Sequence, residues 1–493
     1  MDARTILEIK PALTGYLHQF DDCFARSQTR EHLSTYVQGQ LGDLPRKSVE
    51  PMADAAGVPP RTLQEFLSLS KWDESMMRDR LPRRVAARHT HPQAVGIFDE
   101  TTYVKKGDKT ACVQRQHCGA VGKRENCVAS VHLGYATPDP RGFHTLLDGD
   151  LYLPEQTWHE DRQRCREAGV PDDLVYRPKW RIALEQYQRA LVNGVRLAWL
   201  TFDEGYGGKP PFLRELDGFG QNYVGEVPRD FRVWTSPPPV LHRAHARDQA
   251  MGRPRKYPRL KVKHNPMARV EDVVRHSPLL RQQAWIRYRV KDASQGPMVW
   301  EVKHLPVYRQ DEQGLPTRAH HLLVAGSLTD PNQVKYFISN APPDTPVEVM
   351  LLVAFSRWKI ERMFEDSKME LGMDHFEVRQ FGSIGRHLIL TCVSHLFLAE
   401  FHQKHAGVSR GEKPGPDDQP TGHGNGEAGP DVGAGRTLLA AAGPGDCGAV
   451  DLNAATQRQG RPQPPQGDDP ETARPGCEIE GHASMLLASV VAL

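Results

Sequence analysis

Ser356-Arg-Trp-Lys-Ile-Glu-Arg-Met-Phe-Glu-Asp-Ser-Lys368 has the residue spacing of an amphipathic helix. Its charged side chains recur every three or four residues and are therefore expected on one face: Arg357, Glu361, Glu365 and Lys368. Another face carries an apolar stripe: Ile360, Met363, Phe364 and Leu371. Two carboxylates between two cations can form a ladder of surface ion pairs, or one wall of a metal-dependent active site. The remaining sequence has to decide between them.

Around this stretch the sequence predicts the last part of a folded core, residues 341–405. The helix is expected to begin at Thr345-Pro346 and to end near Gly372, and a second, buried helix is expected over about 385–403. After His405 the composition changes, because the last 88 residues contain 16 Gly, 10 Pro and no aromatic residue. Such a segment cannot build a core, so 406–493 is predicted to be a disordered tail. The tail is either a native extension or the product of a frame change.

Composition places the chain among soluble proteins. Its hydrophobic share of 39% and charged share of 25% are ordinary, and no apolar run reaches the roughly 18–20 residues that span a bilayer. The eight cysteines are scattered without a CxxC pair, which favours reduced thiols and a cytoplasmic location, with no membrane partner. The net charge of +2 combines a tail of −6 with a remainder of +8. A basic folded part is compatible with a nucleic-acid partner without establishing one.

Residues 1–90 are predicted to be helical. Within them, 48–68 has the pattern of a helix, a turn at Gly57 and a second helix. This is the shape of a helix-turn-helix DNA reader, and also of an ordinary helical hairpin in a small bundle. Shape alone favours the ordinary hairpin.

Two short apolar runs further along stop at the same tripeptide. One ends Phe98-Asp-Glu100 and the other ends Phe202-Asp-Glu204, and both are predicted to be buried strands in a region over 91–225. Ligands of open α/β sheets collect beyond the carboxyl ends of strands. Either aspartate alone is better explained as a strand terminator or helix cap. Their repetition in one context favours a shared site at Asp99 and Asp203.

Residues 226–340 are predicted to be rich in strands and to contain a basic loop. The loop over 241–265 carries eight Lys/Arg against one acid and includes Gly252-Arg-Pro-Arg-Lys256. This motif is similar to the Arg-Pro core of minor-groove hooks. A solvated loop and a phosphate contact through Arg253, Arg255 and Lys256 explain it about equally well, whereas base reading is less favoured.

Asp99, Asp203 and Glu361 are carboxylates on three separate predicted elements. Mg²⁺ prefers oxygen ligands, and three carboxylates brought together repel one another unless cations share the site. Two metal ions about 4 Å apart can activate a water or a 3′-hydroxyl for in-line phosphoryl transfer. Arg357 and Lys368, on the face of Glu361, could then hold DNA phosphates.

At these residues the chain resembles the DDE transposases of bacterial insertion sequences, in the branch with a tyrosine-arginine-glutamate-lysine signature. Arg357, three residues, Glu361, six residues and Lys368 fit the signature. The flanks are also similar: Phe98-Asp-Glu-Thr-Thr-Tyr-Val-Lys-Lys-Gly107, Thr201-Phe-Asp-Glu-Gly-Tyr-Gly207 and Leu371-Gly-Met-Asp-His-Phe-Glu-Val-Arg379. The resemblance covers roughly residues 15–405. The tyrosine position holds Ala354 with Phe355 beside it, a departure from the family pattern.

The resemblance implies an α/β fold, a ribonuclease-H-like mixed sheet flanked by helices, with a β-rich insertion and a helical N-terminal region for end binding or assembly. It implies Asp99, Asp203 and Glu361 as catalytic metal ligands for two Mg²⁺ ions, with Mn²⁺ able to substitute. It also implies DNA as partner, both transposon ends and target, and a homodimer in the synaptic complex. The expected function is metal-dependent strand cleavage and strand transfer in cut-and-paste transposition.

Two other interpretations are kept. The first is a catalytically inactive, DNA-binding remnant of a transposase, in which the acids are relics. The second is a glycoside hydrolase with paired carboxylates about 5–10 Å apart. The second gives no reason for the spacing of Arg357 and Lys368 or for the basic loop, and it ranks last.

Overall fold

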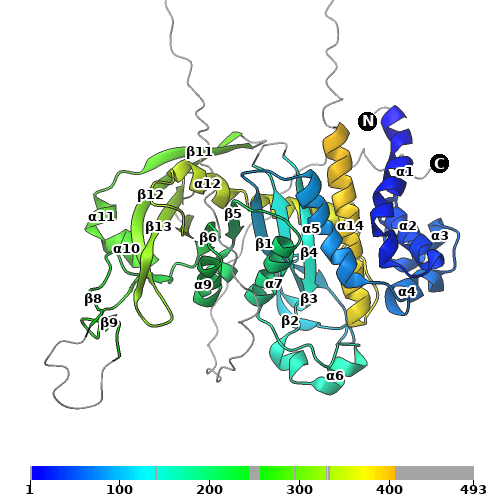
Figure 1. Cartoon of the computed structure of the whole chain (residues 1–493), viewed down its shortest axis with the longest axis horizontal. Helices are drawn as coiled ribbons and strands as arrows, with labels where there is room; N and C mark the ends of the chain where they lie inside the picture. Colours follow the sequence, from blue (N-terminus) through cyan, green and yellow to red (C-terminus); the bar gives the residue numbers. More distant parts are fainter. Residues whose placement is uncertain are drawn as a thin grey trace, which may run out of the picture. The chain divides into compact units, whose positions relative to one another are not determined.

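A mixed sheet of ten strands runs through the computed structural model (Figure 1). The structure describes residues 3–138, 142–243, 256–293, 296–328, 330 and 333–405. Arg253, Arg255 and the predicted tail over 406–493 lie outside the described residues. The sheet follows the order β11-β12-β13-β14-β6-β5-β1-β3-β2, and β4 also pairs with β3.

The middle of the sheet has the ribonuclease-H-like arrangement that the sequence predicts. Strands β1, β3 and β4 form an antiparallel meander, and β5 and β6 continue it in parallel to β1. β2 completes a hairpin with the start of β3. The strands of this part span Val95–Val104 (β1), Gln114–Cys118 (β2), Lys123–Ala136 (β3), His144–Leu151 (β4), Trp199–Phe202 (β5) and Tyr223–Val227 (β6). Their apolar side chains are buried on both faces, as expected for the centre of an α/β sheet.

The β-rich region continues the same sheet. β14 pairs antiparallel with β6, and β13, β12 and β11 follow outward in turn. The four strands are Ile286–Ala293 (β11), Gly296–Gln310 (β12), Pro316–Ser327 (β13) and Val334–Ser339 (β14). Short pieces lie before them: Arg232–Val233 (β7), Val240–Leu241 (β8), Arg259–Leu260 (β9), Ala268–Arg269 (β10), Val270–His276 (α10) and Pro278–Arg281 (α11). The β-rich region therefore adds its strands to the core sheet on the side of β6.

Helices flank the sheet and carry the rest of the core (Figure 1). They span Glu155–His159 (η2), Arg162–Glu167 (α6), Lys179–Val192 (α7), Glu204–Gly207 (α8), Pro210–Gly218 (α9), Val347–Phe355 (α12), Trp358–Met369 (α13) and Phe381–His405 (α14). By length and composition α14 is the one described helix able to cross a membrane. Because 72% of its most apolar window is buried inside the protein, it also fits the pattern of a core helix.

The N-terminal region is helical, as predicted, and packs on α14. Its helices are Ala3–Leu17 (α1), His18–Cys23 (η1), Ser27–Leu41 (α2), Val49–Ala55 (α3), Pro60–Ser68 (α4) and Glu74–Arg88 (α5). A turn at Gly57, with φ of 66°, joins α3 to α4. The apolar face of α4, including Leu63 and Phe66, is fully buried, and the ring of Tyr36 on α2 lies 6.0 Å from that of Phe66. The hairpin thus contributes to a helical bundle.

The single helix predicted from Thr345 to Gly372 is wrong in one respect, because the chain breaks it into α12 and α13. At the break the hydroxyl of Ser356 donates to the carbonyl of Val353 at 2.7 Å. The next amides bond three residues back, Lys359 to Ser356 and Ile360 to Arg357, both at 3.0 Å. These tighter bonds turn the chain between the helices, and Arg357 becomes the residue that precedes α13.

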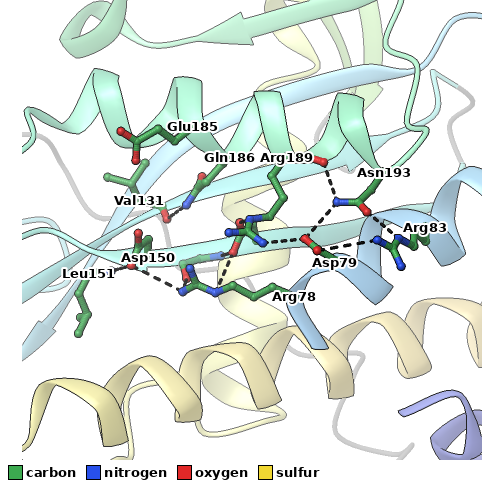
Figure 2. Close-up of polar contacts among 12 residues, drawn as sticks. Arg78, Asp79, Arg83, Val131, Asp150, Leu151, Glu185, Gln186, Arg189 and Asn193 are labelled. Carbon is green, nitrogen blue, oxygen red and sulfur yellow. Dashed lines mark hydrogen bonds and ion pairs between the residues drawn. The ribbon is translucent and has the colours of Figure 1, made fainter. Parts of the chain in front are cut away.

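A cluster of ion pairs joins the N-terminal helices to the sheet (Figure 2). Arg78 on α5 lies 3.5 Å from Asp148 and 3.6 Å from Asp150, both on β4. From α7, Arg189 lies 3.6 Å from Asp148 and 2.7 Å from Asp79 on α5. Asp148 is only 4% exposed, so its charge depends on these arginines. The cluster fixes α5 against β4 and α7.

Candidate active site

Asp99 and Asp203 lie side by side in sequence register on adjacent parallel strands. The sequence predicts that both apolar runs stop at their aspartate; this is right for β5, which ends at Phe202, and wrong for β1, which continues through Asp99 to Val104 because it stays paired with β3. Phe98 on β1 is in register with Phe202 on β5, and each aspartate is the next residue along its chain. Asp99 is 9% exposed, and its Oδ1 accepts the backbone N–H of Glu100 at 2.8 Å. The repeated Phe-Asp sequence therefore places two carboxylates on neighbouring central strands of the sheet.

Asp203 also caps the short helix α8. Its Oδ1 accepts the backbone N–H of Gly205 at 2.9 Å and that of Tyr206 at 3.4 Å. The structural role expected of a strand-ending aspartate is thus present, and it holds this carboxylate in a fixed position. Gly207 follows immediately, and a Cβ there would lie 1.9 Å from a backbone carbonyl oxygen of β6. The close approach of α8 to β6 keeps Asp203 beside Asp99.

Arg357 links the third acid to the first. Its Nη1 donates to Asp99 Oδ2 at 2.7 Å, and its Nη2 donates to Glu361 Oε1 at 3.0 Å. The Arg357 side chain is 20% exposed, whereas that of Glu361 is 63% exposed. Glu361 is therefore linked to Asp99 by the guanidinium of Arg357, and most of the Glu361 side chain is exposed to solvent. Glu365 pairs with Arg362 at 3.0 Å and takes no part in the site.

Of the other predicted DNA-binding residues, the structure describes Lys368 and Lys256. Lys368 is half-buried, and its ammonium donates to the carbonyl oxygen of Thr102 at 3.4 Å and lies 5.8 Å from the ring centre of Tyr103. Burial lowers the pKa of Lys368, and the charge of Asp374 opposes this by raising it. Lys256, within the basic loop, is exposed and is the first described residue after position 255.

Burial dominates the electrostatics of the two aspartates. It raises the pKa of Asp99 to about 7, while Arg357 lowers that pKa and Asp203 raises it further. Burial also raises the pKa of Asp203, and Arg357 again opposes the change. Two carboxylates held together in a poorly solvated place thus require a cation. In the structure Arg357 provides it.

The carboxylates of Asp99, Asp203 and Glu361 are suitable ligands for a divalent cation, but in this structure they are not arranged to hold one. Among the described residues, no group of three or more His, Cys, Asp or Glu side chains is gathered closely enough to hold a metal ion. The guanidinium of Arg357 nevertheless marks a cation position shared by Asp99 and Glu361, with Asp203 close enough to raise the pKa of Arg357 as they do. Carboxylate oxygens are the ligands that Mg²⁺ prefers.

Two neighbours of the site were not predicted from the sequence. Glu100 pairs with Lys179 at the start of α7, with an N–O distance of 2.6 Å, and its charge raises the pKa of both aspartates. Tyr206 is buried, and its hydroxyl has no hydrogen-bond partner among the described residues. Burial raises the pKa of Tyr206, and the nearby acids raise it further. The repeated Phe-Asp-Glu tripeptide could have indicated Glu100, whereas no sequence pattern indicates Tyr206.

The position of the family tyrosine is closed to substrate. Ala354 is 4% exposed within α12. The ring of Phe355 lies 5.0 Å from that of Trp300 and 5.7 Å from that of Phe337, inside the packing between α12 and the sheet. Neither residue presents a polar group to the acids.

Comparisons with known proteins show the family of the chain. Residues 19–297 match a family described as DDE superfamily endonuclease, a span that includes Asp99 and Asp203 and stops before Glu361. A probable transposase for insertion sequence element IS701 from Microchaete diplosiphon is 26% identical over 373 residues, covering 75% of this chain and 82% of that protein. The cryo-EM structure of the piggyBac transposase synaptic complex with hairpin DNA gives a TM-score of 0.35 at 9% identity, covering 82% of this chain and 74% of that chain.

Proposed function

The chain belongs to the DDE superfamily of endonucleases, enzymes that cleave DNA, and we propose that it is the transposase of an insertion sequence that works by cutting and pasting. The observation that carries the proposal is that Arg357 donates to both Asp99 and Glu361, with the charge of Asp203 acting on the same guanidinium, where β1 and β5 run side by side. A surface ladder of ion pairs along one helix would give Asp99 and Asp203 no reason to share that cation.

Enzymes of this family generally use divalent metal ions. We propose that Asp99, Asp203 and Glu361 hold two Mg²⁺ ions, which Mn²⁺ can replace. When bound, such ions lower the pKa of the attacking hydroxyl and stabilise the leaving oxygen of an in-line displacement. The chain contributes the positions of the carboxylates: β1 and the cap of α8 fix the two aspartates, and α13 carries the glutamate.

Arg357 and Lys368 are proposed to hold the DNA backbone beside these acids. A guanidinium matches a phosphate with two parallel hydrogen bonds, as it now matches two carboxylates. Once released from Asp99 and Glu361, Arg357 can bind the phosphate being cut. Lys368, further along the same face, serves the next phosphates as a point charge.

The remaining assignments follow from the same proposal. The helical region over 1–90 would bind the transposon ends or join subunits, and Arg253, Arg255 and Lys256 would contact DNA phosphates. The partner is DNA, both ends and target, with a homodimer in the synaptic complex. An enzyme with this substrate belongs in the cytoplasm of a bacterial cell and requires no membrane partner.

An inactive, DNA-binding remnant remains the second candidate. The observation that favours it is the absence, among the described residues, of three acids close enough to hold a metal. Glu361 is largely exposed and tied to Arg357, as it would be in a relic of a site. A single cleavage experiment separates the two candidates.

The test is Mg²⁺-dependent nicking of DNA that carries the ends of the element. Wild-type protein is expected to nick it with Mg²⁺ or Mn²⁺ and not with EDTA, whereas Asp203→Asn and Glu361→Gln lose activity by a factor of at least about 10³, an effect of about 4 kcal/mol. Glu365→Gln, on the same helix, is the matched control and keeps activity. A wild type without metal-dependent nicking would support the remnant, and activity unchanged in Asp203→Asn would refute the assignment of the acids.

A further inference from the structure

The strand register places the acidic site and a group of exposed cations on one face of the sheet. β1 pairs with β3 without a register shift, so Asp99 shares its face with every second residue up to Lys105, which donates its backbone N–H to Asn126. Asn126 is paired with Arg115 on β2. Arg124 lies two residues before Asn126 on β3 and so points to the same face. Asp99, Arg115 and Arg124 therefore face the same way.

We name three exposed cations at this end of the sheet the hairpin patch: Lys106, Arg115 and Arg124. His117 is paired with Arg124 across the β2–β3 hairpin, so both share the face of Arg115. The amide of Asn126 donates to the carbonyl oxygens of Lys105 at 3.0 Å and Gly107 at 2.6 Å. This bond pair holds the loop that carries Lys106 against the hairpin.

The Lys and Arg side chains of the hairpin patch have no acidic partner among the described residues. Two acids are near in sequence. Asp108 is exposed in the adjoining loop, and Glu125 lies on the opposite face of the hairpin, where it pairs with Lys123 at 3.9 Å. Most other cations around the site are engaged, as Arg357 is. The patch is thus a source of uncompensated positive charge in a fixed β-hairpin.

Further cations lie between the acids and the hairpin patch. The ammonium of Lys368 sits 5.8 Å from the ring centre of Tyr103, and that of Lys105 sits 3.4 Å from the ring centre of Phe376. Asp374 is the exposed acid near both. From Asp99 to the level of Arg124 is eight strand residues, or about 27 Å. That length equals about eight base pairs of duplex DNA at 3.4 Å each.

We propose that the hairpin patch binds the phosphate backbone of duplex DNA, independently of sequence, about eight base pairs from the strand that the acids cut. The inference rests on the proposed function for the identity of the acidic site. Lys and Arg on a rigid hairpin fit regularly spaced phosphates, and they read no base because their contacts are electrostatic. A merely solvated surface would carry the same charges without any effect on DNA affinity.

The test compares two full-length variants with three substitutions each. Lys106→Gln/Arg115→Gln/Arg124→Gln removes the patch, and Arg181→Gln/Arg196→Gln/Arg281→Gln removes three exposed arginines elsewhere. Affinity for a 30-base-pair duplex of arbitrary sequence is measured by fluorescence anisotropy in EDTA over a range of KCl concentrations. The patch variant is expected to bind on the order of 100-fold more weakly at 100 mM KCl, with a salt slope smaller by roughly two to three. The control variant should match wild type within about twofold.

A third variant keeps the charge: Lys106→Arg/Arg115→Lys/Arg124→Lys should retain wild-type affinity and slope. If the patch variant binds like the control, or the charge-conserving variant loses as much as the glutamine variant, the patch is not a backbone contact. Far-ultraviolet circular dichroism verifies that all three variants fold. Because binding is measured in EDTA, a protein that binds through the patch but never nicks DNA would refute the proposed function alone.

Discussion

Replacing Asp99 with asparagine is expected to stabilise the metal-free protein, by an amount that grows as the pH rises from about 4 to about 7. The carboxyl of Asp99 lies where burial raises its pKa from 3.8 to about 7, even with Arg357 beside it. The folded protein therefore holds a proton on Asp99 in a pH range where the unfolded chain has released it. Stability that depends on this proton is present below about pH 4 and is lost as the pH rises to about 7.

The size of the effect follows from the pKa difference. A shift of about three units, at about 1.4 kcal/mol per unit, lowers the free energy of unfolding by up to about 4 kcal/mol once Asp99 is ionised. Asparagine has the shape of the protonated acid and cannot ionise. The Asp99→Asn protein should therefore match wild type near pH 4 and exceed it by a few kcal/mol near pH 8.

The assay is urea unfolding in EDTA at several pH values between about 4 and 8, followed by circular dichroism. Asp54→Asn serves as the control, because Asp54 is exposed on α3. If the difference in unfolding free energy between Asp99→Asn and wild type does not grow with pH, ionisation of Asp99 does not destabilise the folded protein and the prediction is refuted. The same substitution should abolish nicking, so stability and activity would move in opposite directions.

Three further predictions concern single positions. Arg357→Ala should bind Mn²⁺ at least roughly tenfold more tightly than wild type, because the ion no longer competes with a guanidinium that donates to two carboxylates. Electron paramagnetic resonance of unbound Mn²⁺ measures the affinity, and weaker binding by the variant would contradict this prediction. Arg78→Met should lower the urea midpoint by an amount equivalent to about 3 kcal/mol, and adding Asp148→Leu should restore part of it, since the buried carboxylate is then removed as well. Gly207→Ala should destabilise the protein by several kcal/mol because its Cβ would lie 1.9 Å from a carbonyl oxygen, whereas Gly218→Ala, with nothing within 4 Å, should be neutral in a thermal melt.

Much of the fold could be predicted because its signals are local. Both apolar runs that lead to Phe-Asp form strands, and the second of them, β5, ends at Phe202 as predicted, whereas β1 continues past Asp99 to Val104. Periodicity reports which side chains must be buried, and burial is decided residue by residue along one element. The break between α12 and α13 was missed because the bond at the break joins the hydroxyl of Ser356 to the carbonyl of Val353. A continuous helix through Ser356 would have the same amino-acid composition, so the sequence does not distinguish the two.

By itself the sequence determined the repeated Phe-Asp-Glu motif that contains Asp99 and Asp203, and the helical spacing of Arg357, Glu361 and Lys368. Only the tertiary structure decided which charges meet. Arg357 could not be assigned to Asp99, because an ion pair between residues 258 positions apart depends on how β1 and α13 pack. The unpartnered hydroxyl of Tyr206 is likewise a product of packing. Local patterns fix what each element buries, whereas the partners of polar groups are set by distances that exist only after the elements have assembled.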